Sequence, residues 1–167
     1  MELDEFIFQV KQNTDWKSES RIIGEACEDF VKNKIKCIRC DDYANFEKCK
    51  TNEKSIDLIC INCNQKYQIK AKNVTQRQVD NILFKKQFKT IGGEYSTTLN
   101  NITEKIDYLI VLYEKHCYNI LSILYIKNEN VNSDCIIPRK PLSATAKRAG
   151  WQGCSIVFDH VQNIKIG

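Results

Sequence analysis

Apolar positions recur with the period of a helix in two segments, residues 18–33 and residues 74–89. The residues that share this spacing are Ile22, Ala26, Cys27 and Phe30 in the first segment and Val79, Ile82, Leu83 and Phe88 in the second. One-sided apolar spacing of this kind is typical of a helix that packs on a core. Ser18 or Ser20 can cap the first segment. The sequence therefore predicts two helices.

Shorter apolar segments lie between and after these helices. Residues 55–60 are β-branched and residues 66–72 alternate between apolar and polar side chains, so together they predict a hairpin. Three more strands are expected at residues 107–113, 119–127 and 134–137. We expect a turn at Gly92-Gly93, and a turn with a short capped helix in residues 141–151. Helices and strands in this order predict an α/β fold with a mixed central sheet.

Length and composition fit one folded domain that spans residues 1–167. The chain is 43% hydrophobic and 10% aromatic, which is enough to bury a core, and it has no internal repeat or linker. No apolar run approaches the roughly 18–20 residues of a membrane helix, and the mixed N-terminus lacks the pattern of a secretory signal. We therefore expect a cytoplasmic protein without a membrane partner. The net charge of +4 permits a nucleic-acid partner without requiring one.

Nine cysteines are many for a protein in a reducing compartment, and this number favours metal binding over disulfides. Four of them form two pairs of the CxxC type, Cys37 with Cys40 and Cys60 with Cys63. Four thiolates at this spacing can close tetrahedrally on zinc, as in zinc ribbons, and leave no open position for a substrate. The sequence therefore predicts a structural zinc ribbon within residues 37–63. The alternatives are buried reduced cysteines, a disulfide, or Cys49 as a substitute ligand.

Three polar residues lie on the predicted hairpin beside these cysteines. Asp57 precedes the second CxxC pair, and Gln68 and Lys70 follow it two positions apart, so these two share one face of a strand. Asp57 can bind magnesium through oxygen, and Lys70 can stabilise the charged transition state of phosphodiester hydrolysis. Glu28, on the first helix, can approach the same centre. The alternative is that Gln68 and Lys70 form the solvated face of an edge strand.

A basic segment follows the last predicted strand. Its charged, hydroxyl and aromatic residues are Arg139, Lys140, Ser143, Thr145, Lys147, Arg148 and Trp151. Basic groups and hydroxyls suit phosphate contacts, and a tryptophan can stack on a base. A capped helix with a solvated basic face and a core tryptophan is an equally good interpretation. Residues alone leave both open.

Several segments together resemble the DpnI-like, or Dam-replacing, restriction endonucleases. They are Glu28-Asp29-Phe30, the knuckle from Cys37 to Cys40, the segments Ser55 to Cys63 and Tyr67 to Lys72, and the nearly verbatim segment Arg139 through Cys154. The resemblance runs from about residue 18 to residue 156. It implies a PD-(D/E)XK nuclease fold with a zinc ribbon, in which Asp57 and Lys70 are catalytic and Gln68 replaces the second acid.

The same resemblance implies the activity and the partner. We expect a type II site-specific deoxyribonuclease that uses magnesium to hydrolyse phosphodiester bonds of double-stranded DNA, with an adenine-methylated, GATC-like site as its target. Magnesium would be held by Asp57 and Gln68, and DNA would contact Lys72 and the basic segment.

Two departures from the family pattern leave alternatives open. Gln68 stands where the family usually has Glu, and a neutral carbonyl oxygen is a weaker magnesium ligand than a carboxylate, although Mrr-like nucleases resemble this chain in having an active core with Gln. A C-terminal winged-helix domain, which full-length relatives add, is not visible. The first alternative is therefore a non-catalytic, zinc-containing DNA-binding module derived from such a nuclease. The second is a zinc-ribbon adaptor for other proteins.

Overall fold

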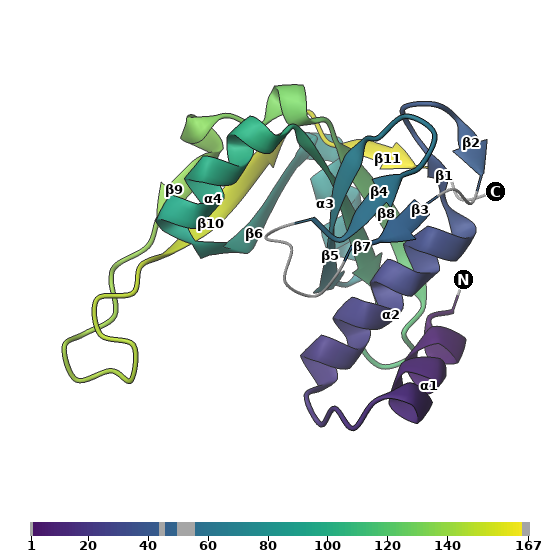
Figure 1. Ribbon diagram of the computed structural model, residues 1–167, viewed down its shortest axis with the longest axis horizontal. Coiled ribbons are helices and arrows are strands. Elements are labelled where there is room, and N and C mark those ends of the chain that lie inside the picture. Colours follow the sequence, from purple (N-terminus) through teal and green to yellow (C-terminus); the bar gives the residue numbers. More distant parts are fainter. Residues whose placement is uncertain (1, 44–45, 50–55, 165–167) are drawn as a thin grey trace.

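The fold contains helices, a large sheet and a smaller second sheet. Figure 1 shows the computed structural model, which describes residues 2–43, 46–49 and 56–164. The helices are α1 (Asp4–Asn13), α2 (Glu19–Lys34), α3 (Gln76–Lys85) and α4 (Tyr95–Asn101), with 3₁₀ turns at Ile102–Glu104, Asn128–Asn130 and Ser133–Cys135. The strands are β1 (Lys36–Cys37), β2 (Asp42–Tyr43), β3 (Phe46–Lys48), β4 (Leu58–Cys60), β5 (Lys66–Asn73), β6 (Gln87–Glu94), β7 (Ile106–Tyr113), β8 (Ile120–Ile126), β9 (Ile136–Pro138), β10 (Gly153–Asp159) and β11 (Gln162–Ile164).

The main sheet is mixed, as the sequence predicts. Its six strands run in the order β11-β8-β7-β5-β4-β3, and the second sheet has the order β6-β10-β9. Only the β5–β7 pair of the main sheet is parallel, and the segment between these two strands contains α3, β6 and α4. Every residue of β7 is buried, which places this strand at the centre of the core.

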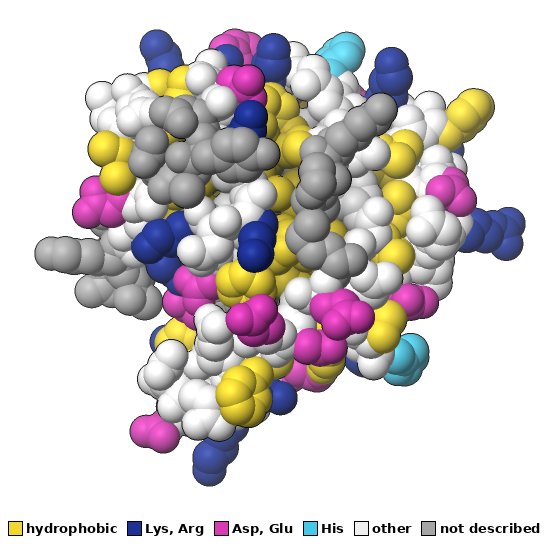
Figure 2. Space-filling model, turned by 90° about the vertical axis from the view of Figure 1, so that its right-hand side faces the viewer, with side chains coloured by type: hydrophobic (Ala, Val, Ile, Leu, Met, Phe, Trp, Pro, Cys, Tyr) yellow, Lys and Arg dark blue, Asp and Glu magenta, His cyan; other side chains and the backbone are white. Residues whose placement is uncertain are grey.

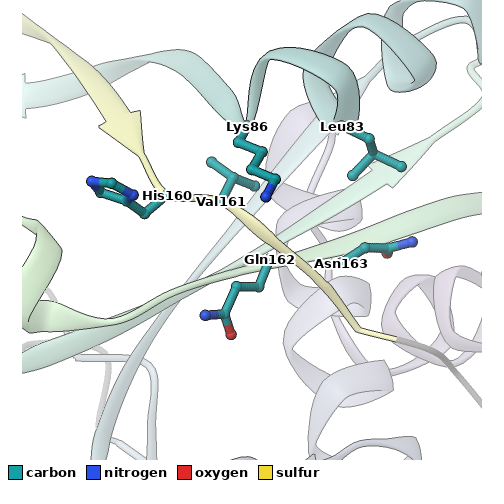
Figure 3. A pocket seen from close by; sticks show the side chains of 6 residues that line it. All are labelled: Leu83, Lys86, His160, Val161, Gln162 and Asn163. Carbon is teal, nitrogen blue, oxygen red and sulfur yellow. The ribbon is translucent and has the colours of Figure 1, made fainter.

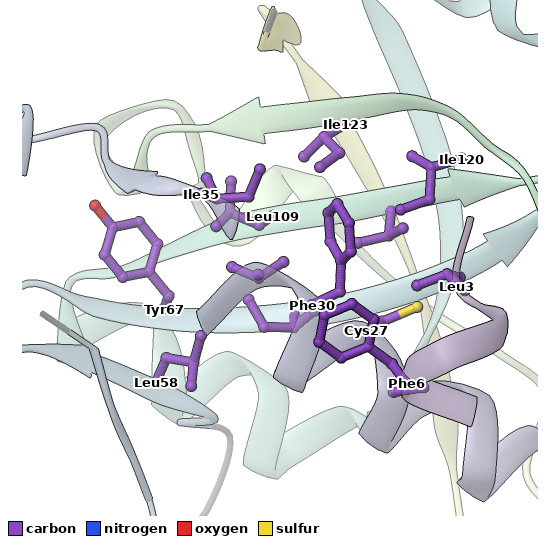
Figure 4. Close-up of a cluster of buried hydrophobic side chains, with 14 of the residues drawn as sticks. Leu3, Phe6, Cys27, Phe30, Ile35, Leu58, Tyr67, Leu109, Ile120 and Ile123 are labelled. Atoms are coloured by element: carbon purple, nitrogen blue, oxygen red, sulfur yellow. The ribbon is translucent and has the colours of Figure 1, made fainter. Parts of the chain in front are cut away.

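The two faces of the main sheet pack against different partners. We call the face covered by α1 and α2 the first face; Figure 4 labels its buried side chains Leu3, Phe6, Cys27, Phe30, Ile35, Leu58, Tyr67, Leu109, Ile120 and Ile123. The second face is covered by α3 and the second sheet, with buried residues that include Val79, Phe88, Tyr108, Ile110, Leu124, Ile156 and Phe158. Neighbouring residues of a strand point to opposite faces. Tyr67 and Ile69 lie on the first face, so Gln68 and Lys70 point toward the second.

Most of the predicted elements are present. The helix expected at residues 18–33 is α2, and the strands expected at residues 66–72, 107–113 and 119–127 are β5, β7 and β8. Antiparallel pairing of β4 with β5 confirms the hairpin. The strand expected at residues 55–60 is shorter, since β4 covers Leu58–Cys60 and residue 55 lies outside the described residues. The strand expected at residues 134–137 is replaced by a 3₁₀ turn followed by β9.

The helix predicted for residues 74–89 is wrong at its end, because α3 stops at Lys85. Thr75 and Gln78 form a capping box at its start, and Lys86 ends it in the left-handed conformation, with φ 50°. The next residues enter β6, where Phe88 pairs with Phe158 of β10 and is buried. Burial in the second sheet outweighs the helical spacing of this apolar residue.

Gly92 and Gly93 lie within β6, so the predicted glycine turn is also wrong. A Cβ atom at Gly92 would lie 2.5 Å from Sγ of Cys154 on the neighbouring strand β10. The glycine is therefore needed for a close approach between strands and not for a turn.

Residues 141–151 do not form the predicted short helix. They belong to a long loop between β9 and β10, which projects from the lower left of Figure 1. Hydrogen bonds between backbone groups close its base: the amide of Arg139 donates to Gly153 over 2.9 Å, and that of Leu142 to Trp151 over 2.9 Å. We call residues 139–152 the basic loop. The apolar pattern of the sequence does not predict the helices α1 and α4 or the strands β1, β2, β3, β6, β10 and β11.

Candidate active site and cysteine cluster

The two CxxC pairs meet in space and form one cluster. The Sγ atoms of Cys37, Cys40, Cys60 and Cys63 all lie within 4.8 Å of one another. The closest distances, 3.5 Å between Cys37 and Cys63 and 3.6 Å between Cys40 and Cys60, are near the roughly 3.8 Å expected between thiolates bound tetrahedrally at about 2.3 Å from zinc. These four cysteines could therefore hold a metal such as zinc.

Both CxxC turns have the same backbone geometry. In each, the residue after the second cysteine has a positive φ, 54° at Asp41 and 58° at Asn64. The amide of Asp41 donates to the carbonyl of Cys37 over 2.7 Å, and that of Asn64 donates to the carbonyl of Cys60 over 2.8 Å. Asp and Asn adopt the left-handed conformation more readily than most residues. The sequence thus forms two matching turns that direct their sulfur atoms to one point.

The hydroxyl of Tyr67 lies 3.2 Å from Sγ of Cys37 in the buried part of the cluster. Burial raises the pKa of the Cys37 thiol, but hydrogen bonds from Tyr67 and the backbone outweigh this effect and lower the pKa to about 7. Burial and the neighbouring Cys37 raise the pKa of Tyr67, so its hydroxyl stays protonated and donates the hydrogen bond to Sγ of Cys37. A thiol that ionises this readily is suited to binding a metal.

Arg39, between the first two cysteines, connects the cluster to the centre of the main sheet. Its guanidinium donates two hydrogen bonds, of 2.7 and 2.8 Å, to the fully buried carboxylate of Asp107 on β7. Asp107 also accepts hydrogen bonds from the hydroxyl of Tyr125 and from the backbone and side chain of Asn128. Glu129 binds the outer side of Arg39 at 2.7 Å. A buried carboxylate that accepts this many hydrogen bonds fixes the position of Arg39 and, through it, of the first CxxC turn.

Asp57 lies where β4 stops pairing with β5. Its backbone amide donates to Tyr67 over 2.9 Å, and its carboxylate accepts the backbone amide of Ile69 at 2.6 Å. The Asp57 carboxylate thus accepts the hydrogen bond from the Ile69 amide that a longer β4 would have accepted through its backbone. Burial raises the pKa of Asp57 against the effects of the Ile69 amide and the Lys70 charge. The same burial lowers the pKa of Lys70, which the charge of Asp57 opposes. The two side chains therefore form a partly desolvated pair of opposite charge.

A cluster of carboxylates on α2 lies beside Asp57 and surrounds one lysine from β3. Nζ of Lys48 contacts Glu25, lies 2.9 Å from Asp29 and lies 3.3 Å from Glu28. The pKa of Glu28 is raised to about 7, first by burial and then by the charge of Asp57, while Lys48 lowers it. Burial lowers the pKa of Lys48, but the hydrogen bonds that it donates to Glu25 and Asp29 outweigh this effect and raise the pKa. Glu28 and Asp57 are therefore close enough to interact, and Lys48 offsets part of their negative charge.

Gln68 and Lys70 line one pocket of about 250 Å³ on the second face. Its other lining residues are Gly93, Glu94, Thr97, Thr98, Asn101, Tyr108 and Ile156. Tyr108 is the β7 residue in register with Gln68. β7 pairs with β5 along both residues, whereas β4 pairs with β5 only as far as Tyr67. Gln68 and Lys70 therefore belong to an internal strand of the sheet and face this pocket on its second face.

The basic loop exposes its cations, and Lys72 is exposed on β5. In the basic loop, the hydroxyl oxygens of Ser143 and Thr145 lie 3.1 Å apart. Trp151 is half-buried, and the guanidinium of Arg148 lies 4.6 Å from its ring centre. Figure 2 shows a different face, on which acidic and basic side chains are interspersed. The basic loop therefore presents four exposed cations, Arg139, Lys140, Lys147 and Arg148, within ten residues.

A separate pocket of about 430 Å³ lies between the end of α3 and β11 (Figure 3). It is lined by Leu83, Lys86, His160, Val161, Gln162 and Asn163, none of which was predicted as a site residue. Lys86 and His160 both have positive φ, and the amide of Val161 donates to the carbonyl of Lys86 over 3.1 Å. This pocket shares no residue with the one that Gln68 and Lys70 line.

Sequence reasoning missed three parts of this region. Arg39 stands between two predicted metal ligands, and a charge at that position was an available signal. The polar residues of α4 recur at helical spacing and face the pocket, a pattern that could have been found. No local sequence pattern marks Lys48, and its contacts appear only when β3 is placed against α2.

Among the described residues, no helix is long and apolar enough to cross a membrane.

Comparison with known families gives a match that covers nearly the whole chain. A family model described as "DpnI: Dam-replacing family" matches residues 4–165. The match includes both CxxC pairs, Asp57, Lys70 and the basic loop. The chain therefore belongs to the Dam-replacing family, whose members are restriction-type DNA nucleases associated with methylation.

Proposed function

We propose that this protein is a magnesium-dependent endonuclease of the restriction type that hydrolyses phosphodiester bonds of double-stranded DNA. The observation that carries this proposal is the junction of β4 and β5, where Asp57 and Lys70 interact and Gln68 and Lys70 line one pocket. We assign the fold to the PD-(D/E)XK type, with residues 1–167 as one nuclease-like domain. Family membership supports both assignments.

The residues around Asp57 suit a hard divalent cation. Asp57 offers carboxylate oxygen and Gln68 offers carbonyl oxygen, the ligand types that magnesium prefers. Four carboxylates, of Glu25, Glu28, Asp29 and Asp57, meet the ammonium groups of Lys48 and Lys70 here. When all six groups are ionised, the region has a net charge of −2. A bound magnesium ion would supply charge to polarise the phosphate and to acidify a water molecule.

The chain's own groups position the substrate and stabilise charge. The Ile69 amide fixes the orientation of the Asp57 carboxylate. Lys70 directs an ammonium group toward the phosphate, where burial strengthens its effect on developing negative charge. Glu28 provides a further oxygen for the metal or its water molecules.

DNA contacts are proposed for the exposed cations around this centre. Lys72 continues the strand that carries Gln68 and Lys70, and the basic loop projects beyond the second sheet. The proposed phosphate-binding residues of the loop are Arg139, Lys140, Ser143, Thr145, Lys147 and Arg148. Trp151 supports the loop through Arg148 and is proposed to meet a base or sugar. We propose structural zinc in the cysteine cluster, where it would fix the hairpin that carries Asp57.

Digestion of plasmid DNA tests this function. Plasmid grown with adenine methylation should be cut when magnesium is added, and plasmid grown without it should resist. Asp57→Asn and Lys70→Met should each lower the cleavage rate about a hundredfold or more, because each removes a charge that acts in the transition state. Lys66→Met is the matched control, since Lys66 is on the same strand but pairs with Glu104 at 3.0 Å.

The alternative is a DNA-binding module without catalysis, and Gln68 in place of an acid is the observation that favours it. This module would bind DNA with an affinity that falls steeply with salt. Folded wild-type protein that binds DNA but cuts neither plasmid, with magnesium or manganese, would establish the alternative and rule out the endonuclease.

A further inference from the structure

The wall of the pocket opposite Gln68 and Lys70 is the polar side of α4. Glu94, Thr97, Thr98 and Asn101 all line the pocket, and their spacing places them on one face of the helix. At about 250 Å³ the pocket is smaller than the roughly 300–1,000 Å³ of small-molecule sites, so it suits a hydrated ion better than an independent organic ligand.

The hydrogen bonds within this wall determine what it can bind. Oγ1 of Thr97 donates to the Glu94 carboxylate over 2.6 Å, and Oγ1 of Thr98 donates to the Glu94 carbonyl over 2.7 Å. A hydroxyl has one hydrogen, so both threonines can only accept hydrogen bonds from the pocket. The wall therefore presents acceptor oxygens, the Asn101 amide and one carboxylate, opposite the ammonium group of Lys70. The carboxylate and the acceptor oxygens suit a cation with its water shell.

We infer that Glu94, the residue that ends β6 and precedes α4, supplies the negative charge that Gln68 does not supply from β5. Its carboxylate, with Thr97 and Thr98, holds the water shell of the divalent cation that Asp57 and the carbonyl of Gln68 are proposed to bind. This inference rests on the proposed nuclease function, and it adds a metal-binding residue that lies outside the Asp57 and Gln68-x-Lys70 pattern. The acidic ligand is thus present in the pocket, on a different element.

Manganese binding without DNA tests the inference, with the free-ion electron paramagnetic resonance signal as the readout. Glu94→Gln keeps an acceptor for Thr97 and removes only the charge, so it should fold and bind manganese about tenfold more weakly than the wild type. Glu104→Gln is the matched control, because it makes the same change outside the pocket and should leave the affinity unaltered. Thermal unfolding of both variants checks that the fold is kept.

A double-mutant cycle shows whether Glu94 does the work of the missing acid. Gln68→Glu should tighten manganese binding more in the Glu94→Gln background than in the wild type, because the two carboxylates serve the same ion and repel each other. Unchanged binding by Glu94→Gln, or strictly additive effects, would overturn the inference. Because no DNA is present, a protein that failed to cut DNA could still show this coupling, and an active nuclease could lack it.

Discussion

The two faces of the main sheet are covered in different ways, and the candidate site lies where they meet. The first face packs against α1 and α2, which precede the sheet in sequence, and its polar rim is the carboxylate cluster around Lys48. The second face packs against a second sheet, whose strands come from distant parts of the chain. Asp57 interacts with the first rim, while Gln68 and Lys70 face the second side. Side chains of either face alone would leave the site incomplete.

The largest effect is expected from the hairpin that both faces share. Cys60→Ser should abolish the metal binding proposed for the cysteine cluster and lower the free energy of unfolding by about 4 kcal/mol or more, since loss of a metal site is among the most damaging changes. Metal analysis and denaturant unfolding measure both quantities. Cys117→Ser is the control, because Cys117 is exposed and outside the cluster. A Cys60→Ser protein that kept its metal and its stability would show that the cluster assignment is wrong.

A smaller effect should distinguish the tightly packed second face from the helix on the first. Gly92→Ala places a Cβ atom 2.5 Å from Sγ of Cys154 and 3.1 Å from Cγ1 of Ile156, so it should cost about 2 kcal/mol of unfolding free energy. Gly24→Ala in α2 meets no atom within 4 Å and should stabilise the protein by about 0.5–1 kcal/mol. Urea unfolding measures both, and equal signs would contradict this contrast.

The smallest effect concerns the rim of the first face. Lys48→Met leaves the carboxylates of Glu25, Glu28 and Asp29 to repel one another and should lower the free energy of unfolding by about 1 kcal/mol. Added magnesium should recover part of this loss in the variant, because a divalent cation can replace the ammonium charge. The Lys66→Met control should show no such recovery. Unfolding with and without magnesium decides the matter.

The sequence predicted the first side of the molecule better than the second, for a physical reason. In α2 and β5 the local apolar spacing agrees with the final burial, as Phe30 and Ile69 illustrate. In β6 the two disagree, because the spacing places Phe88 in a helix whereas the structure pairs it with Phe158, seventy positions away. The sequence predicts a turn at Gly92 because it does not show that Cys154 packs against this glycine.

The candidate site divides in the same way. Asp57, the second CxxC pair, Gln68 and Lys70 could be proposed from spacing and family resemblance, because they follow one another on a single hairpin, and the first CxxC pair repeats the spacing of the second. The positions of Glu94 and Lys48 beside them could not be proposed, because each residue reaches the region from an element whose place depends on long-range pairing. The expected helix in the basic loop failed for a related reason, since backbone bonds between Arg139 and Gly153 close the loop instead.

The bond between Arg39 and Asp107 affects how experiments with chelators should be interpreted. Arg39 lies between two cysteines of the cluster, and Asp107 precedes Tyr108, which lines the pocket. A strong chelator that removed a metal from the cysteines would therefore loosen an ion pair that ends next to the proposed active site. Inhibition by such a reagent is then no proof of a catalytic metal. Only recovery on adding back magnesium alone, while the cysteine cluster keeps its proposed ion, separates the two proposed metal sites.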